Sequence, residues 1–218
     1  MRRTETFPTG DARSTVTIDM ASGQIEVRAI ATSEIVVHLD TDQAGDWDIS
    51  KFGDNVVVRA PRRRRMRSAK LYVQVPEHTN VSVDAASADL SMAGTLGDVR
   101  VRTASGDVRA DIVERLDVSS ASGDVNVRRV TGRLVASTAS GDIRADRVDD
   151  DCHCGTASGD VRIDCCAGDA VEVKTVSGDI QLGLPSGIRV DPDISTLSGR
   201  TRLPQPRPTT TDAPRRNV

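Results

Sequence analysis

Aromatic side chains are nearly absent from this chain: Phe7, Trp47, Phe52 and Tyr72 are the only four among 218 residues. Beyond Tyr72, any hydrophobic core must therefore consist of small aliphatic side chains. Such a composition favours a thin, regular core over that of a conventional globular domain.

Long apolar runs and a strong charge bias are also missing. No stretch approaches the roughly 18 apolar residues that span a bilayer, and no apolar segment follows the N-terminal arginines. The net charge of −3 gives no overall attraction to nucleic acid. We therefore expect a cytoplasmic protein without a specific nucleic-acid partner.

The sequence does contain an internal repeat. The phrase TASGDVRAD of residues 103–111 returns as TASGDIRAD from Thr138 and as TASGDVRID from Thr156. Ser-Gly pairs mark the copies at a spacing of roughly 18 residues. They begin at Ser105, Ser122, Ser140, Ser158, Ser177 and Ser198.

Between these pairs, apolar and polar residues alternate with the period of a half-buried strand. When the copies are aligned, apolar residues form columns that we expect to point inward, such as those of Val99, Val101, Ala104, Val108 and Ala110. Units this short cannot fold alone, but stacked about 4.8 Å apart they bury a continuous core. The sequence thus predicts an all-β fold, a single-stranded β-solenoid with coils of about 18 residues.

The segment before the repeats has a different pattern. Residues 15–20, 24–28, 34–39 and 55–59 look like antiparallel strands. Because an open sheet edge invites aggregation, we expect residues 1–80 to be an antiparallel β segment that caps the N-terminal end of the solenoid. The repeat array is expected over residues 81–203, followed by a disordered tail at 204–218 that is rich in Pro, Thr and Arg.

The passage VQVPEHTNVSVDAASADLSM, with the strand pattern before it and the SGD repeats after it, resembles a family of bacterial β-strand-repeat proteins known as "putative adhesins". The resemblance covers roughly residues 10 to 203. It implies a β-solenoid with a binding or envelope-associated role and no established catalytic residues.

The first candidate site is an outward column of charge. Its members are the Asp after each of the first five Ser-Gly pairs and the Arg that follows two residues later in three of these copies, namely Asp107, Asp124, Asp142, Asp160 and Asp179 with Arg109, Arg144 and Arg162. Carboxylates stacked about 4.8 Å apart would suit Ca²⁺, as in β-rolls. We favour the alternative that each Asp bonds local turn amides beside the arginines, because these turns lack the dense glycines of β-rolls.

The repeated Ser and Thr residues do not predict catalysis. A nucleophile needs a positioned base, and the only histidines, His38, His78 and His153, do not recur with the repeats. We expect hydroxyl groups that bond the backbone of the turns, and we expect neither an enzyme nor a cofactor.

The cysteines form a second candidate site. Cys152, Cys154, Cys165 and Cys166, with His153, have the residue types of a zinc site. Three of them fall in apolar columns, however, so we expect buried thiols at 152, 154 and 166 and an exposed thiol at the turn residue Cys165. A metal site or a disulfide is the alternative.

A dense basic run is the third candidate. It comprises Arg62, Arg63, Arg64, Arg65 and Arg67. A solvated loop between strands explains it, and peripheral contact with an anionic membrane surface is the alternative.

Together these features predict a non-enzymatic scaffold or binding module, adhesin-like, with a protein or polysaccharide partner. A filament that self-associates by end-to-end stacking and a Ca²⁺-binding β-roll are the alternatives. A polysaccharide-cleaving β-helix is disfavoured, because the array lacks long loops that carry acids and aromatic residues.

Overall fold

The computed structural model describes residues 2–10, 12–61, 68–185 and 192–203. Apart from one short 3₁₀ turn, η1 (Ala44–Asp46), the regular elements of this part of the chain are all β-strands. The strands are β1 (Arg2–Pro8), β2 (Thr15–Ile30), β3 (Glu34–Asp40), β4 (Asp48–Phe52), β5 (Asn55–Arg59), β6 (Ala69–Pro76), β7 (Asn80–Ser105), β8 (Val108–Ser122), β9 (Val125–Val130), β10 (Leu134–Ser140), β11 (Ile143–Val148), β12 (Cys152–Ser158), β13 (Val161–Ile163), β14 (Val171–Ser177), β15 (Ile180–Leu182), β16 (Asp193–Ser198) and β17 (Thr201–Arg202).

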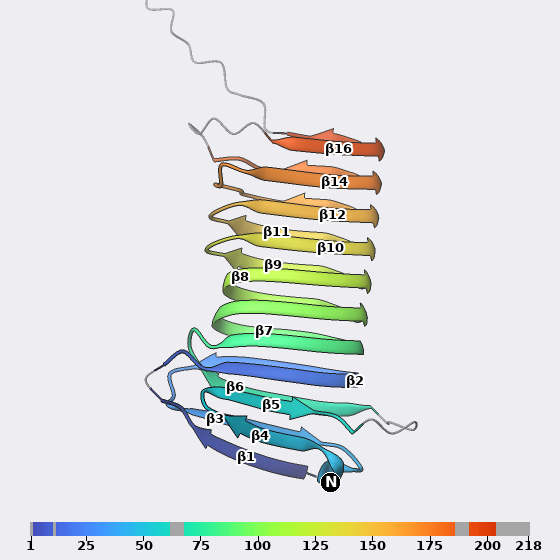
Figure 1. The fold of residues 1–218 in the computed structure, drawn as a ribbon. Helices are drawn as coiled ribbons and strands as arrows, with labels where there is room; N and C mark the ends of the chain where they lie inside the picture. Colours follow the sequence, from blue (N-terminus) through green and yellow to red (C-terminus); the bar gives the residue numbers. More distant parts are fainter. Residues whose placement is uncertain (1, 11, 62–67, 186–191, 204–218) are drawn as a thin grey trace, which may run out of the picture.

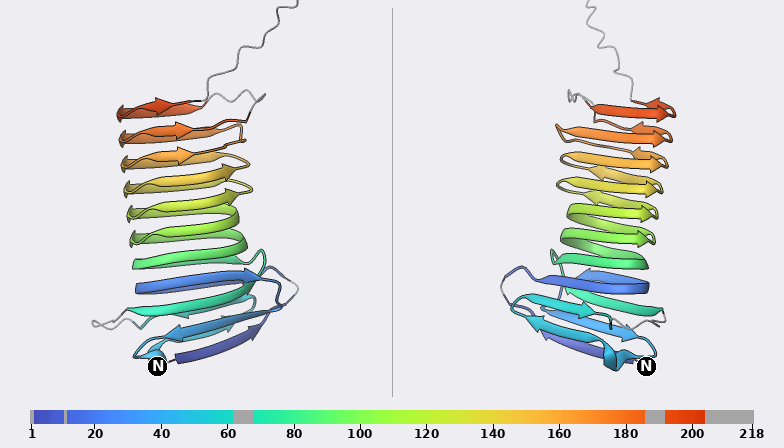
Figure 2. Two further views of the ribbon diagram at one scale, coloured as in Figure 1. Left: turned by 180° about the vertical axis from the view of Figure 1, so that it is seen from behind. Right: turned by 45° about the vertical axis from the view of Figure 1, so that its right-hand side comes forward.

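The strands stack as coils of a β-solenoid, and the predicted fold class is confirmed (Figure 1). Along one side, which we call the first sheet, β8, β10, β12, β14 and β16 pair in parallel. Along the other side, the second sheet, β8, β9, β11, β13, β15 and β17 pair in parallel. Each coil crosses from the first sheet to the second at its Ser-Gly turn, and the views from behind and from the side show the same ladder (Figure 2).

The core lies between the two sheets and follows most of the predicted columns. Leu134 pairs with Leu116 in one neighbouring coil and with Cys152 in the next, and all three are buried. On the second sheet, Ile143 pairs with Val125 and Val161 in the same manner. A substitution at one of these positions therefore removes contacts from the coils on both sides.

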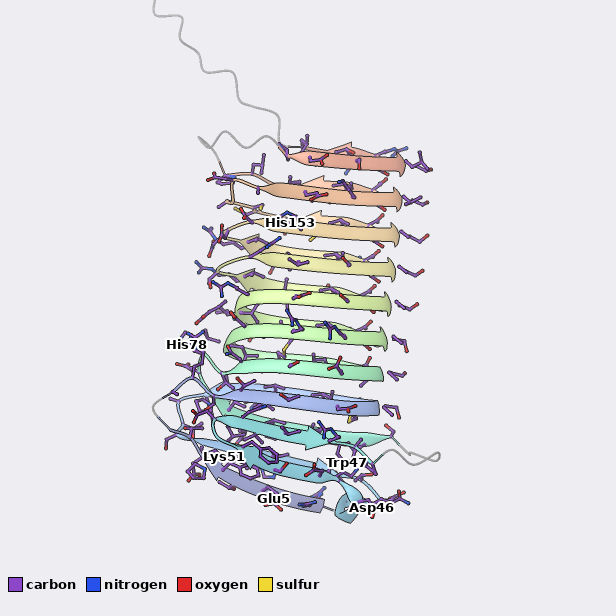
Figure 3. The ribbon with its side chains drawn as sticks, in the orientation of Figure 1. Glu5, Asp46, Trp47, Lys51, His78 and His153 are labelled. Carbon is purple, nitrogen blue, oxygen red and sulfur yellow. The ribbon has the colours of Figure 1, made fainter. Side chains whose placement is uncertain are left out.

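Antiparallel strands lie at the N-terminal end of the stack (Figure 1). There β3 pairs antiparallel with both β1 and β6, and β4 pairs antiparallel with β5. Trp47, labelled beside η1 in Figure 3, is 4% exposed and belongs to the core cluster. The end of the solenoid that carries the aromatic residues is therefore built differently from the coils.

The prediction of antiparallel strands at residues 15–20 and 24–28 is wrong. These residues form the single strand β2, which runs parallel to β7 in an unbroken pattern from Thr15 opposite Asn80 to Arg28 opposite Ala93. β2 also crosses between the sheets at Ser22-Gly23, as later coils do at their Ser-Gly pairs. Parallel stacking thus begins well before residue 81. In the sequence, β2 comes first, and the antiparallel strands lie between it and its parallel partner β7.

The expectation that the Ala104 column points inward is also wrong. Thr103 is buried and Ala104 is exposed, and the same holds for Thr138 and Ala139. The alternation that places Val99 and Val101 inward continues to Thr103, so its neighbour must face solvent. The exposed column consists of Ala21, Ala86, Ala104, Ala121, Ala139, Ala157, Val176 and Leu197.

Candidate functional site

The Asp column is a continuous hydrogen-bonded ladder. Oδ1 of each Asp accepts a hydrogen bond from the backbone N–H of its equivalent in the next coil, at 2.8 to 3.1 Å. The ladder runs through Asp89, Asp107, Asp124, Asp142, Asp160 and Asp179 and ends on the amide of Arg200. Each Asp Oδ1 therefore accepts its hydrogen bond from the next coil, whereas the sequence predicts hydrogen bonds within each turn.

The arginines two residues on pair with carboxylates on the same surface. Arg109 Nη2 lies 2.8 Å from Asp107 Oδ2, and Arg144 Nη2 lies 2.6 Å from Asp142 Oδ2. Arg162 turns the other way and pairs with Asp164 at 2.8 Å. Because Oδ1 is committed to the backbone, a ligand at this column must compete with both sets of bonds, and ligand or Ca²⁺ binding here stays a prediction.

The repeated hydroxyl groups bond the backbone of the turns. Thr156 Oγ1 donates to the carbonyl of Gly141 at 3.2 Å, and Thr175 Oγ1 donates to that of Gly159 at 3.3 Å. These carbonyls belong to the Ser-Gly turns of the preceding coils. Thr196 makes the same bond to Gly178, so Thr156, Thr175 and Thr196 each join their coil to the one before it.

The cysteines are free thiols, and Cys152, Cys154 and Cys166 are buried as expected, while Cys165 is partly buried. The Sγ atoms of Cys152 and Cys154 lie 3.5 Å apart. Hydrogen bonding with Cys154 raises the pKa of the Cys152 thiol, and hydrogen bonding with Cys152 together with burial raises that of Cys166. The described residues contain no group of three or more His, Cys, Asp or Glu that could hold a metal ion.

His153 does not join the thiols. It lies on the surface of the first sheet (Figure 3), with Nε2 3.7 Å from Glu172 Oε2. The basic run at Arg62, Arg63, Arg64, Arg65 and Arg67 lies outside the described residues, and membrane contact through it stays a prediction. No helix in the described part of the chain is long and apolar enough to cross a membrane.

An open groove of about 1050 Å³ lies on the outer face of the first sheet. It runs over four stacked coils along the exposed column, from Ala21 through Ala86 and Ala104 to Ala121. Alanines at these positions leave the backbone uncovered, which creates the hollow. Three charged side chains line it as well, namely Asp19, Asp84 and Arg102.

The family model described as Toastrack DUF4097 matches residues 6–202. The chain belongs to this family. The resemblance expected from the sequence is thereby confirmed, and DUF4097 denotes a domain of unknown function. A comparison with curated proteins finds no match.

Solved structures resemble this Toastrack chain at low sequence identity. A "putative adhesin" from Bacteroides fragilis superposes with a TM-score of 0.61 at 14% identity, covering 93% of this chain and 97% of that one. A "putative lipid binding protein" from Parabacteroides distasonis gives 0.44 at 10% identity, covering 92% and 96%. A "putative adhesin" from the same organism gives 0.42 at 11% identity, with the same coverage. At such identities, the likeness to the first structure shows the fold alone.

The groove is the feature of this Toastrack chain that the sequence did not reveal. Arg102 makes no hydrogen bond or ion pair with the described residues, and neither does Asp84. Ser120 Oγ is buried at the groove and likewise has no partner among the described residues. Counting alternate residues from Val99 would have placed Ala104 outward and revealed the small exposed column.

Proposed function

We propose that the chain is a non-enzymatic binding module that takes a protein partner in the groove of the first sheet. The observation that carries the proposal is the groove itself, an apolar floor of alanines beside Asp84 and Arg102, which are unpaired among the described residues. Protein interfaces commonly have this arrangement, an apolar centre within a polar rim. The similarity to the Bacteroides fragilis "putative adhesin" agrees with a binding role.

The residues that line the groove indicate which side chains a partner needs. The chain contributes small side chains and no aromatic anchors here, so the partner must insert its own larger side chains. Arg102 and Asp84 both lack a partner among the described residues, so a segment that carries both charges would satisfy them.

Catalysis is not supported by the side chains at this site. The groove lining contains no histidine or cysteine, and its two carboxylates lie beside alanines and an arginine. Covalent catalysis would require a nucleophile with a base positioned beside it. Binding is the activity that the arrangement supports.

Selection from a displayed peptide library tests the proposal. The wild-type chain should enrich peptides that bind it and lose affinity at least tenfold when Ala104→Arg and Ala121→Arg fill the groove. Arg133→Ala, an exposed change outside the groove, should leave binding intact. Failure to enrich any peptide, or binding that is insensitive to the groove-filling variants, would contradict the proposal.

A further inference from the structure

A second hollow lies on the outer face of the second sheet, so the core separates it from the groove. It has a volume of about 470 Å³. Residues 70–72 of β6, 24–26 of β2 and 89–91 of β7 line it, with Arg109 of β8 at one side. β6, β2 and β7 are neighbours in the stack (Figure 1), so the hollow spans successive strands near the N-terminal end of the solenoid.

Tyr72 is the aromatic side chain of this hollow, and its ring is held in place. In the sheet, Tyr72 lies opposite His38 on one side and opposite Glu26 on the other. The His38 ring stacks against Tyr72 with the two centroids 5.8 Å apart. The strands that line the hollow all lie on the side of Glu26, so Tyr72 borders the hollow on the side away from His38.

Hydrogen-bonding groups without partners surround the ring. The side chains of Gln24, Lys70 and Ser91 make no hydrogen bond or ion pair with the described residues. Asp89 Oδ1 accepts a hydrogen bond from the amide of Asp107 at 3.1 Å, whereas its Oδ2 has no partner in the described part of the chain. The hollow therefore offers an amide, an ammonium group, a hydroxyl and a carboxylate oxygen to a bound molecule.

The Tyr72 hydroxyl adds a further donor. Gln74 Nε2 donates to this hydroxyl at 3.0 Å, so its oxygen acts as the acceptor and its own hydrogen is left to donate. A ring with a polar tip in contact with a hollow suits a ligand that is apolar on one face and polar at its rim.

We propose that this hollow binds a pyranose unit of an oligosaccharide, with a C–H face of the sugar against Tyr72 and its hydroxyls bonded to the polar side chains. A pyranose has an apolar C–H face and a rim of hydroxyls. Each hydroxyl can donate and accept, so it matches a donor such as Lys70 and an acceptor such as Asp89 equally well. The volume falls within the range of small-molecule sites.

The charges of the hollow favour an uncharged ligand. Lys70 and Arg109 are positive, and Glu26 and Asp89 are negative, so the four formal charges cancel. An anion or a cation would meet as many like charges as opposite ones. A wholly apolar ligand would cover polar side chains such as Ser91 without replacing their hydrogen bonds to water. A neutral molecule rich in hydroxyls avoids both costs.

Saturation-transfer NMR of the full chain tests the inference. The probes are maltose, cellobiose, lactose and N,N′-diacetylchitobiose, each at millimolar concentration. Irradiation of the aromatic protons should transfer saturation to the C–H protons of at least one of these sugars. Tyr72→Ala should weaken its binding at least tenfold, whereas Tyr72→Phe keeps the ring and should retain most of the affinity.

A second variant fills the hollow and leaves the ring in place. Ser91 is exposed, so Ser91→Arg should fold, as checked by far-UV circular dichroism, and should also weaken sugar binding at least tenfold. The control carries Ala104→Arg and Ala121→Arg together. These positions line the groove and not this hollow, so sugar binding should be unchanged. The control also separates this inference from the proposed peptide site, because each site has its own blocking variants.

Three outcomes would overturn the inference. The first is no saturation transfer to any of the four sugars. The second is sugar binding that persists in Tyr72→Ala or, if that variant does not fold, in Ser91→Arg. The third is equal loss of sugar binding in the control with a filled groove.

Discussion

The backbone amide of Asp142 donates a hydrogen bond to Oδ1 of Asp124 in the preceding coil, at 2.9 Å. The same bond recurs along the array, so the Asp of each SGD phrase acts as the acceptor for its successor. The repeated phrase is thereby explained by stacking. Its Asp joins coils, and its Gly lets the chain turn where neighbouring backbones are too close for a side chain.

Asp124→Ala should lower the free energy of unfolding by about 1 to 2 kcal/mol, because the Asp142 amide loses its acceptor. Asp124→Asn keeps an acceptor oxygen at the same place and should lower the free energy of unfolding much less. Urea denaturation of both variants measures the difference. Equal loss in the two variants would show that the charge, and not the acceptor, matters at this position.

Gly141→Ala should be strongly destabilising. Gly141 has φ of 153°, and a Cβ built there would lie 2.2 Å from the carbonyl oxygen of Gly123. We expect a loss of at least about 3 kcal/mol or failure to fold. Gly155→Ala is the matched control, because the nearest atom to its added Cβ is 3.8 Å away. Thermal and urea unfolding should leave this control close to the wild type, and similar losses in both variants would contradict the turn geometry.

Two buried threonines should respond oppositely to loss of the hydroxyl. Thr156→Val removes the bond to the Gly141 carbonyl and should cost about 1 kcal/mol. Thr138→Val should be neutral or stabilising, because Thr138 Oγ1 is buried without a partner. Both are measured by denaturant unfolding, and a larger loss at Thr138 than at Thr156 would refute this assignment.

Stability should fall in acid partly through Glu114. Hydrogen bonds from Arg13, at 2.7 and 3.3 Å, and from His78, at 2.6 Å, lower the pKa of Glu114 below 4.5, although burial opposes the shift. Because the folded pKa is the lower one, this contribution is complete above about pH 5 and is lost as pH falls through the folded value.

Glu114→Gln should therefore cost roughly 1 kcal/mol at neutral pH and almost nothing at pH 3. Unfolding titrations across this range measure the effect, with Asp84→Asn as a control at a carboxylate that has no partner in the described part of the chain. A wild type and Glu114→Gln variant that differ equally at both pH values would remove Glu114 from the acid response.

The sequence was sufficient to predict the period of the coils, the sheet-like core and most inward columns. Val99, Val101 and Val108 alternate with charged residues, and each recurs in later copies. The partner of β2 was less visible, because it lies about 65 residues further along and antiparallel strands intervene. The signal that could have revealed it is Ala21-Ser22-Gly23, which repeats the Ala-Ser-Gly of the array.

The groove was missed because hydrophobicity was given more weight than strand geometry. A column of alanines looks like core, yet Thr103 occupies the inward position and Ala104 follows it outward. A buried Thr is acceptable there because its hydroxyl can bond a turn carbonyl, as Thr156 does. An exposed alanine lowers the stability little, and its small side chain leaves space that a partner can occupy.

The orientation of this column decides whether the groove exists, so cysteine accessibility at adjacent positions tests the account most directly. Ala104→Cys and Thr103→Cys are labelled separately with a water-soluble maleimide, and peptide-resolved mass spectrometry distinguishes each site from the native cysteines. The structure predicts rapid labelling at residue 104 and protection at residue 103 until the protein is unfolded. Protection at 104 with rapid labelling at 103 would contradict both the outward column and the binding surface built on it.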